Sequence, residues 1–136
     1  MIRHANGIGE PLAEALDWSA CGWESARVES AVGELSDDER MRVKAISLNF
    51  NRLGALPLCL QTFSSLTALM LDHNPGIDIS SIGDLTTLKS LTLISCELVE
   101  LPSSIARLTK LEALFLHNNC LAKLPSSLQM LTKLKT

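Results

Sequence analysis

The sequence has very few aromatic residues. Only 4% of its 136 residues are aromatic and none is tyrosine, although 46% are hydrophobic. A core so rich in leucine and so poor in aromatic rings indicates many similar thin layers rather than one irregular interior. The length is that of a single domain.

Sequence signatures of catalysis and metal binding are also missing. The chain has no GxSxG or HExxH motif, and the "GIG" at residues 7–9 lacks the preceding strand that a nucleotide-binding glycine loop requires. None of the four cysteines belongs to a CxxC pair, which argues against a zinc site. We therefore predict a protein that is not an enzyme, with no catalytic residue, no metal and no cofactor.

Long apolar runs are absent as well. No segment approaches the ~18 apolar residues of a membrane span. The first residues, "MIRHANGIGEPLAEALDW", lack the apolar core of a signal peptide. Together with the scattered cysteines, this predicts a cytoplasmic protein in a reducing compartment, with no membrane as partner.

Charge is low overall but unevenly distributed. The net charge of −3 argues against nucleic acid as a partner. Residues 1–42 carry nine acidic and four basic side chains, whereas residues 88–136 carry six basic and three acidic ones. Either these are solvated faces, or an acidic end and a basic end orient the chain towards a partner.

What the sequence does contain is an internal repeat, as in "LEALFLHNNCLAKLPSSLQMLTK" from Leu111. Four units align, at residues 43–65, 66–87, 88–110 and 111–133, and a fifth begins at residue 134. The LxxLxL at the start of each unit alternates apolar and variable residues, as a short strand with one buried face does. One unit cannot bury its own leucines, so stacked units must share a core. The repeat predicts an α/β solenoid of about four coils, with a short parallel β-sheet on its concave face.

Position 9 of the units, counted from Val43, Leu66, Leu88 and Leu111, carries a small polar residue. A side chain there turns inward where the strand has ended, and an amide can satisfy backbone groups between neighbouring coils. We therefore predict a structural role for Asn51, Asn74, Cys96 and Asn119. The second unit, with "NPGIDISSIGDL", is one residue short, so we expect a local kink on its convex side and an intact strand.

These residues resemble the leucine-rich repeat superfamily. The pattern is most similar to the intracellular 23-residue type, LxxLxLxxNxLxxLPxxLxxLxx, of Ras-suppressor-like and plant intracellular Ras-group-related proteins. The resemblance covers residues 43–136. It implies a curved solenoid whose concave sheet binds another protein.

Residues 1–42 do not repeat, and we predict that they form an N-terminal helical cap. Pro11 suits the first turn of a helix that would carry Leu12 and Leu16 on one face. A second helix would bury a face that runs from Trp23 to Leu35, and "SDDE" at residues 36–39 reads as the capping box of a third. Such a cap would cover the first coil; the alternative is a partner-binding helix.

The variable repeat positions 3, 5, 7 and 8 point out of the predicted sheet. Met70, Ile94 and Phe115 are apolar there, flanked by polar residues, as in many protein-binding surfaces. His73 and His117 fall two coils apart, about 10 Å, which is too far to share a metal. The predicted partner-binding residues are Asn49, Phe50, Met70, Asp72, His73, Thr92, Ile94, Phe115, His117 and Asn118.

The predicted function is that of a non-catalytic protein–protein interaction module. Two alternatives stay open: a recognition or autoinhibitory segment of a larger signalling enzyme (a kinase, GTPase regulator or ubiquitin ligase), or an architectural subunit of a large assembly. The last coil lacks a polar cap. It would belong to a longer repeat protein, associate end-to-end, or fray, and it would leave five leucines partly exposed: Leu111, Leu114, Leu116, Leu121 and Leu124.

Overall fold

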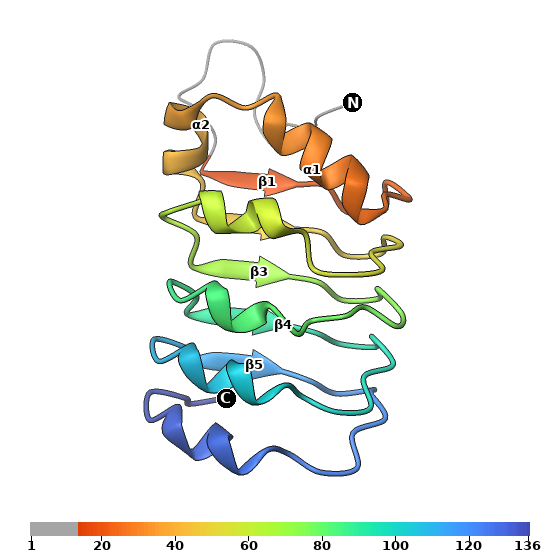
Figure 1. The fold of residues 1–136 in the computed structure, drawn as a ribbon, viewed down its shortest axis with the longest axis vertical. Helices are drawn as coiled ribbons and strands as arrows, with labels where there is room; N and C mark the ends of the chain where they lie inside the picture. The colour runs from red at the N-terminus through yellow and green to blue at the C-terminus, as the bar shows by residue number, and fades with distance from the viewer. Residues whose placement is uncertain (1–13) are drawn as a thin grey trace.

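A computed structural model describes residues 14–136 and contains one parallel β-sheet of five strands. The strands follow one another in chain order, each hydrogen-bonded to the next in the sequence (Figure 1). Their middle residues, Leu16, Ile46, Leu69, Leu91 and Leu114, are in register across the whole sheet. The strands are β1 (Ala15–Asp17), β2 (Ala45–Ser47), β3 (Ala68–Met70), β4 (Ser90–Thr92) and β5 (Ala113–Phe115).

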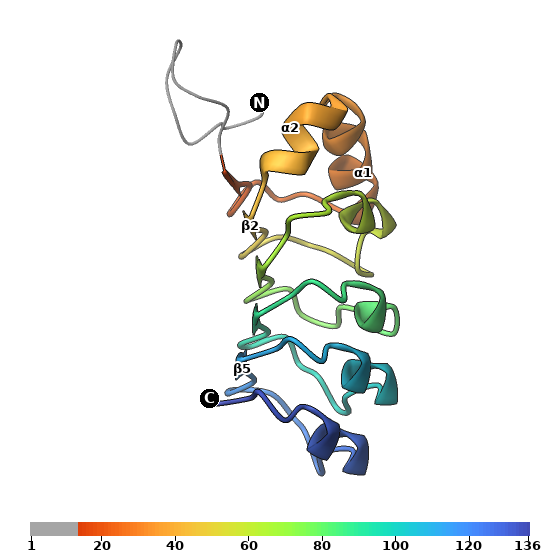
Figure 2. The ribbon, with the colours of Figure 1, turned by 90° about the vertical axis from the view of Figure 1, so that its left-hand side faces the viewer.

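Between strands the chain returns through short helical turns. Figure 2 shows these turns on one side of the molecule and the sheet on the other, so each strand and its return path form one coil. The predicted α/β solenoid with a parallel sheet is therefore confirmed. The turns are the 3-10 helices η1 (Leu58–Thr62), η2 (Ile82–Asp84), η3 (Ser103–Arg107) and η4 (Ser126–Met130).

The core lies between the sheet and the helical turns. In β2 to β5 the middle residue is buried and its two neighbours are half-buried, as period-2 alternation requires. Leucines from every coil join one continuous apolar cluster. Each coil therefore stabilises the next by covering its leucines, in the manner of a repeat array.

The first strand was not foreseen, and it corrects the predicted helix over residues 11–18. Within the described residues, Ala15–Asp17 is strand β1, paired with β2; Pro11 and Leu12 lie outside the described residues. Leu16 and Trp18 are buried as positions 4 and 6 of a repeat are. Alternation of period 2 thus prevails over the helical spacing, and the predicted cap segment contributes a strand to the sheet.

The two helices that follow β1 match the prediction. Helix α1 (Ser25–Gly33) buries Val28, Ala31 and Val32. Helix α2 (Asp37–Arg42) begins with the predicted capping box: Ser36 Oγ accepts from the Glu39 backbone N–H, and the Glu39 carboxylate accepts from that of Ser36. Both helices lie at the β1 end of the stack (Figure 1).

The second repeat unit keeps its strand, as predicted, but its return path is shortened. Helix η2 has three residues where η1, η3 and η4 have five. Gly76 adopts a φ of +74°, a conformation that glycine tolerates best. A Cβ on Gly83 would lie 2.4 Å from the Ser104 carbonyl oxygen, so the two return paths approach as closely as their backbones allow.

At the other end, the fourth unit is less covered. Leu111 is fully buried and Leu114 nearly so, contrary to the expectation that both would be exposed, because η3 and the third unit lie beside them. Leu116 and Leu121 are half-buried and Leu124 is 53% exposed, as expected. The start of the fifth unit continues the ladder, since the Leu114 N–H donates to the Thr136 carbonyl oxygen at 2.7 Å.

Candidate protein-binding face

A column of side-chain amides holds the chain where it leaves the sheet. Asn51 Nδ2 donates to the carbonyl oxygens of Trp18 and Leu48, and its Oδ1 accepts the backbone N–H groups of Cys21 and Trp23. Each amide thereby joins two successive coils. Asn74 and Asn119 form the corresponding bonds one and three coils further on.

Cysteine replaces the amide in two coils of this column. The Cys96 thiol donates to the Leu71 carbonyl oxygen at 3.2 Å, and burial raises its pKa. Cys21 occupies the same place in the first coil, where its thiol donates to the Ser19 carbonyl oxygen at 3.4 Å. A thiol is a weaker hydrogen-bonding group than an amide, so at these two positions neighbouring residues must form more of the backbone hydrogen bonds.

The residue before each of these column positions adopts a left-handed backbone in all five coils. The φ angles lie between +55° and +59°, a region that bulky side chains rarely occupy. This conformation turns the chain sharply at the end of each strand. The residues are Ala20, Phe50, His73, Ser95 and Asn118.

Phe50 and His73 form an aromatic ledge at this turn. Their rings stack with centroids 4.2 Å apart and an angle of 8° between planes. Phe50 is 56% exposed and His73 is also exposed. An exposed ring held rigidly by stacking loses little entropy when a partner covers it, which favours a binding role.

Two of the predicted contact residues also form hydrogen bonds within the chain. Asn49 Oδ1 accepts the Asp72 backbone N–H at 2.7 Å, and Asp72 Oδ1 accepts that of Ile94 at 2.8 Å. Their side chains therefore fix the spacing of adjacent coils next to the ledge. This positions the ledge but leaves fewer acceptors for a partner.

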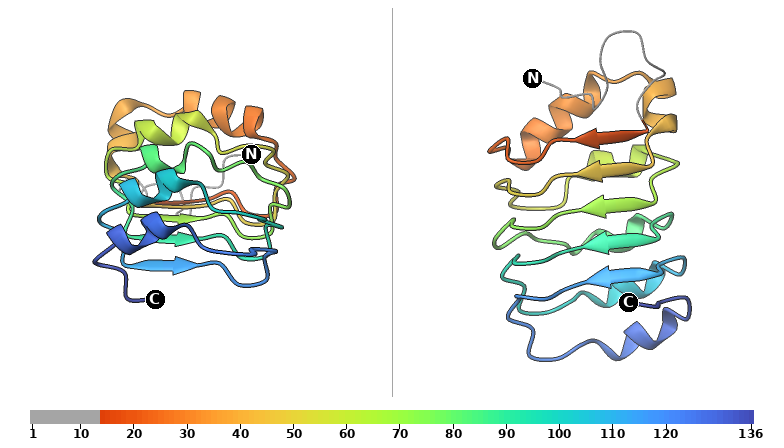
Figure 3. Two further views of the ribbon diagram at one scale, coloured as in Figure 1. Left: turned by 60° about the horizontal axis from the view of Figure 1, so that its bottom comes forward. Right: turned by 180° about the vertical axis from the view of Figure 1, so that it is seen from behind.

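The open face of the sheet carries a short row of half-buried side chains. Met70, Thr92 and Phe115 are in register on β3, β4 and β5, so Met70 and Phe115 flank Thr92 at about 5 Å per strand. All three are half-buried. Ile94 lies two residues beyond Thr92, past the end of β4, and is therefore not a member of this row. The right-hand view of Figure 3 looks directly onto this face of the sheet.

The three residues of the row form a patch whose middle hydroxyl, that of Thr92, is shielded from solvent and has no hydrogen-bond partner among residues 14–136. Met70 and Phe115 are its apolar neighbours in register on either side. His117 and Asn118, at the end of β5, are both exposed and border this patch.

A second concavity lies away from the sheet. It is a cavity of about 280 Å³ between the second and third coils, formed where the second unit is shortened. That volume is at the lower limit of ligand pockets, ~300 Å³. It is lined by Ile77, Asp78, Val99, Glu97, Glu100 and Pro102, among others.

The remaining chemistry of the chain is sparse. Among residues 14–136, no three His, Cys, Asp or Glu side chains come together as a metal site, and all four cysteines are free thiols. Burial and a hydrogen bond to the Glu29 carboxylate raise the pKa of Cys59 to about 12, which keeps the thiol protonated. No helix in the described part of the chain is long and apolar enough to cross a membrane.

Comparison with solved structures identifies the fold. A leucine-rich repeat protein of Leptospira interrogans matches 75% of this chain with 32% identity and a TM-score of 0.64. The fold is that of the leucine-rich repeat superfamily. An internalin of Listeria monocytogenes, InlF, matches 71% with 26% identity and a TM-score of 0.52. The leucine-rich repeat domain of the type III effector XopL matches 91% with 20% identity and a TM-score of 0.53.

This leucine-rich repeat chain spans only part of those proteins. The matches cover 27%, 35% and 59% of the Leptospira protein, the internalin and the effector domain, respectively. A scan against protein-family models and a search of curated proteins returned no match.

Two features of the face escaped the sequence-based prediction. The first coil is visible in the sequence as Leu16-x-Trp18-x-x-Cys21, which places residues at repeat positions 4, 6 and 9. Its signal is weak because Trp replaces Leu, and because thirty residues, rather than 22 or 23, separate it from the next unit. The stacking of Phe50 on His73 depends on the alignment of two coils and has no local sequence signal.

Proposed function

We propose that this chain is a non-catalytic protein-recognition module that binds its partner on the concave face of the sheet. The observation that supports it is the row of Met70, Thr92 and Phe115, in register on three adjacent strands, with the aromatic ledge of Phe50 and His73 at its side. Apolar anchors beside a polar rim are typical of protein interfaces.

The row and the ledge would have distinct roles in binding. Met70 and Phe115 are the anchors, because a partner that covers them removes apolar surface from water. His117 and Asn118 form the polar rim and would fix the orientation of the partner. The small residues at repeat position 3, Ala45, Ala68, Ser90 and Ala113, leave a shallow trough in which a partner segment can lie.

The partner in this proposal is another protein in the cytoplasm, and neither a nucleic acid nor a membrane. The intracellular 23-residue subtype fits the 23-residue length of the first, third and fourth units. The likeness to a leucine-rich repeat protein of Leptospira interrogans supports an interaction module.

A paired substitution tests the proposal. Met70→Asp with Phe115→Asp should abolish partner capture in a crosslinking pull-down from the native cell, because two charges would be buried under the partner. The matched control is Val99→Asp, since Val99 is 68% exposed on the other side of the coil. Thermal midpoints of both variants should stay near that of the unmodified chain. Equal capture by all three proteins would refute the concave-face proposal.

A further inference from the structure

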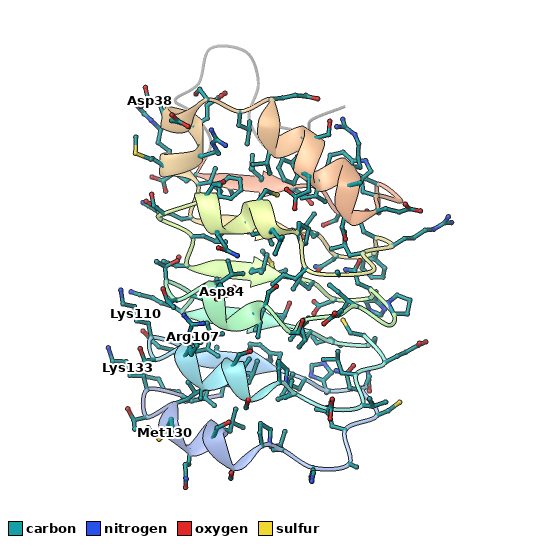
Figure 4. All side chains as sticks on the ribbon, viewed as in Figure 1. Asp38, Asp84, Arg107, Lys110, Met130 and Lys133 are labelled. Atoms are coloured by element: carbon teal, nitrogen blue, oxygen red, sulfur yellow. The ribbon has the colours of Figure 1, made fainter. Side chains whose placement is uncertain are left out.

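Basic side chains gather along the edge where the strands of the third and fourth units begin. We name this the basic edge; Figure 4 shows three of its members, Arg107, Lys110 and Lys133, on the same side of the molecule. Backbone bonds place Lys89, Glu112 and Lys135 in successive coils there, since Glu112 N–H donates to the Lys89 carbonyl and Lys135 N–H to that of Glu112. The basic edge consists of Lys89, Arg107, Lys110, Lys133 and Lys135.

The carboxylates at this edge do not neutralise it. Arg107 pairs with Asp84 at 3.0 Å and Lys135 with Glu112 at 3.0 Å. Within residues 14–136, the ammonium groups of Lys89, Lys110 and Lys133 have no ion-pair partner. Three lysines, Lys135 foremost and then Lys89 and Lys133, hold the pKa of Glu112 below its usual value, so one carboxylate is shared among several cations.

Other acidic residues lie away from the basic edge. Asp78, Glu97 and Glu100 line the cavity beyond the far ends of the strands. At the basic edge itself, the first coil is different: Lys44 is paired with Glu14 at 3.0 Å, and Asp38 is exposed at that end in Figure 4. The excess of positive charge is therefore confined to the third and fourth coils.

We propose that the basic edge binds an acidic segment of the protein that occupies the concave face. This inference rests on the proposed function, because the edge borders the trough at repeat position 3, and Lys89 directly precedes Ser90 of β4. Coils are about 5 Å apart, and carboxylates two residues apart in an extended peptide are about 6.7 Å apart, a spacing that flexible lysines can meet.

The extent of the basic edge favours a short peptide over other polyanions. Duplex DNA carries one negative charge per ~1.7 Å and would continue along the edge onto the acidic first coil. A flat anionic membrane would meet the same carboxylates, including the exposed Asp37 and Asp38. A segment with a few carboxylates can bind the third and fourth coils alone.

The test uses the chain of residues 1–136 and a fluorescein-labelled twelve-residue peptide of alternating Glu and Ser, with Gln in place of Glu as the control peptide. Fluorescence anisotropy at 0.15 M salt, where charges are screened beyond ~8 Å, reports only nearby cations. We expect binding of the Glu peptide, and about tenfold weaker binding to the Lys110→Glu, Lys133→Glu double variant. Lys123→Glu, an exposed lysine of the fourth unit beyond the end of β5, should change affinity less than about twofold.

No binding of the Glu peptide, equal loss in Lys123→Glu, or tighter binding of a twelve-residue oligothymidylate or of phosphatidylserine vesicles would overturn the proposal. Lys110→Gln with Lys133→Gln, which should give an intermediate loss, serves if the charge-reversed variant fails to fold. The Met70→Ser, Phe115→Ser variant removes the proposed anchors without adding charge, so it should lose partner capture but bind the Glu peptide, and a failure of the concave-face proposal is distinguishable from a failure of this one.

Discussion

The two ends of the solenoid bury the same repeat positions to different extents. At the first coil, α1 contributes Val28, Ala31 and Val32 to the core, and Trp18 is completely buried. At the last coil, Leu124 and Met130 are 53% and 62% exposed. The residue types are similar, so the difference shows that a leucine in this fold is shielded from water only when a neighbour covers each side of its coil.

The sharpest test of this comparison is a pair of leucines at the same repeat position. Leu60 in η1 is fully buried, whereas Leu128 in η4 is half-buried. Leu60→Ala should lower the free energy of unfolding by about 3–4 kcal/mol, because a cavity remains where the residue was removed. Leu128→Ala should cost about 1 kcal/mol, since less apolar area leaves the core.

Urea denaturation followed by circular dichroism measures both values. The slope m, by which the free energy of unfolding falls with urea concentration, should be the same in the two variants, so that their free energies can be compared directly. Equal costs at the two positions would mean that the last coil is packed as firmly as the coil of Leu60, and the comparison would fail.

The amide column offers a second comparison, in which the hydrogen bonds are matched. Asn51 and Asn119 each accept two backbone N–H groups and donate to two carbonyl oxygens, one in their own coil and one in the coil before; Asn51 also donates to the Asn49 carbonyl oxygen at 3.4 Å. Asn51 is buried and Asn119 is only half-buried. Asn51→Ala should cost about 2–3 kcal/mol and Asn119→Ala about 1 kcal/mol, because water can replace the lost bonds only at the second site.

Thermal denaturation of the two alanine variants, with Asn51→Asp as a control that keeps the acceptor, separates these contributions. The aspartate variant should lose the bonds to the Trp18 and Leu48 carbonyl oxygens while retaining those from Cys21 and Trp23. If Asn119→Ala were the more damaging change, exposure would not govern the value of these bonds.

The same contrast between coils explains how far the sequence could predict the molecule. The four repeat units predict their strands and their inward leucines, because these depend on residues within one unit, and the missing residue of the second unit matches its shortened η2. The first coil escaped because α1 and α2 replace the usual return path, which stretches the spacing to thirty residues. Because two packed helices take the place of the return path, the first coil lacks the regular spacing by which the sequence reveals the other coils.

The predicted contact residues show a different limit. Asn49 and Asp72 read as surface polar residues, yet each bonds to the backbone of the following coil. Ile94 reads as part of an apolar row but lies beyond the end of its strand. Both results depend on which residues face each other across coils, and a single unit of sequence does not contain that information.

The smallest effect concerns thiol reactivity at the two ends. Cys59, beside Glu29 of α1, has a pKa of about 12, because burial and the Glu29 carboxylate both disfavour the thiolate. At pH 8 to 9 nearly all of it is therefore protonated, and iodoacetamide, which reacts with the thiolate, should modify it far more slowly than the exposed Cys120. Peptide mapping by mass spectrometry gives both rates. Glu29→Gln should speed the modification of Cys59, since a neighbouring negative charge is removed, whereas Glu34→Gln should not; comparable rates for Cys59 and Cys120 in the unmodified chain would show that α1 does not protect the first coil.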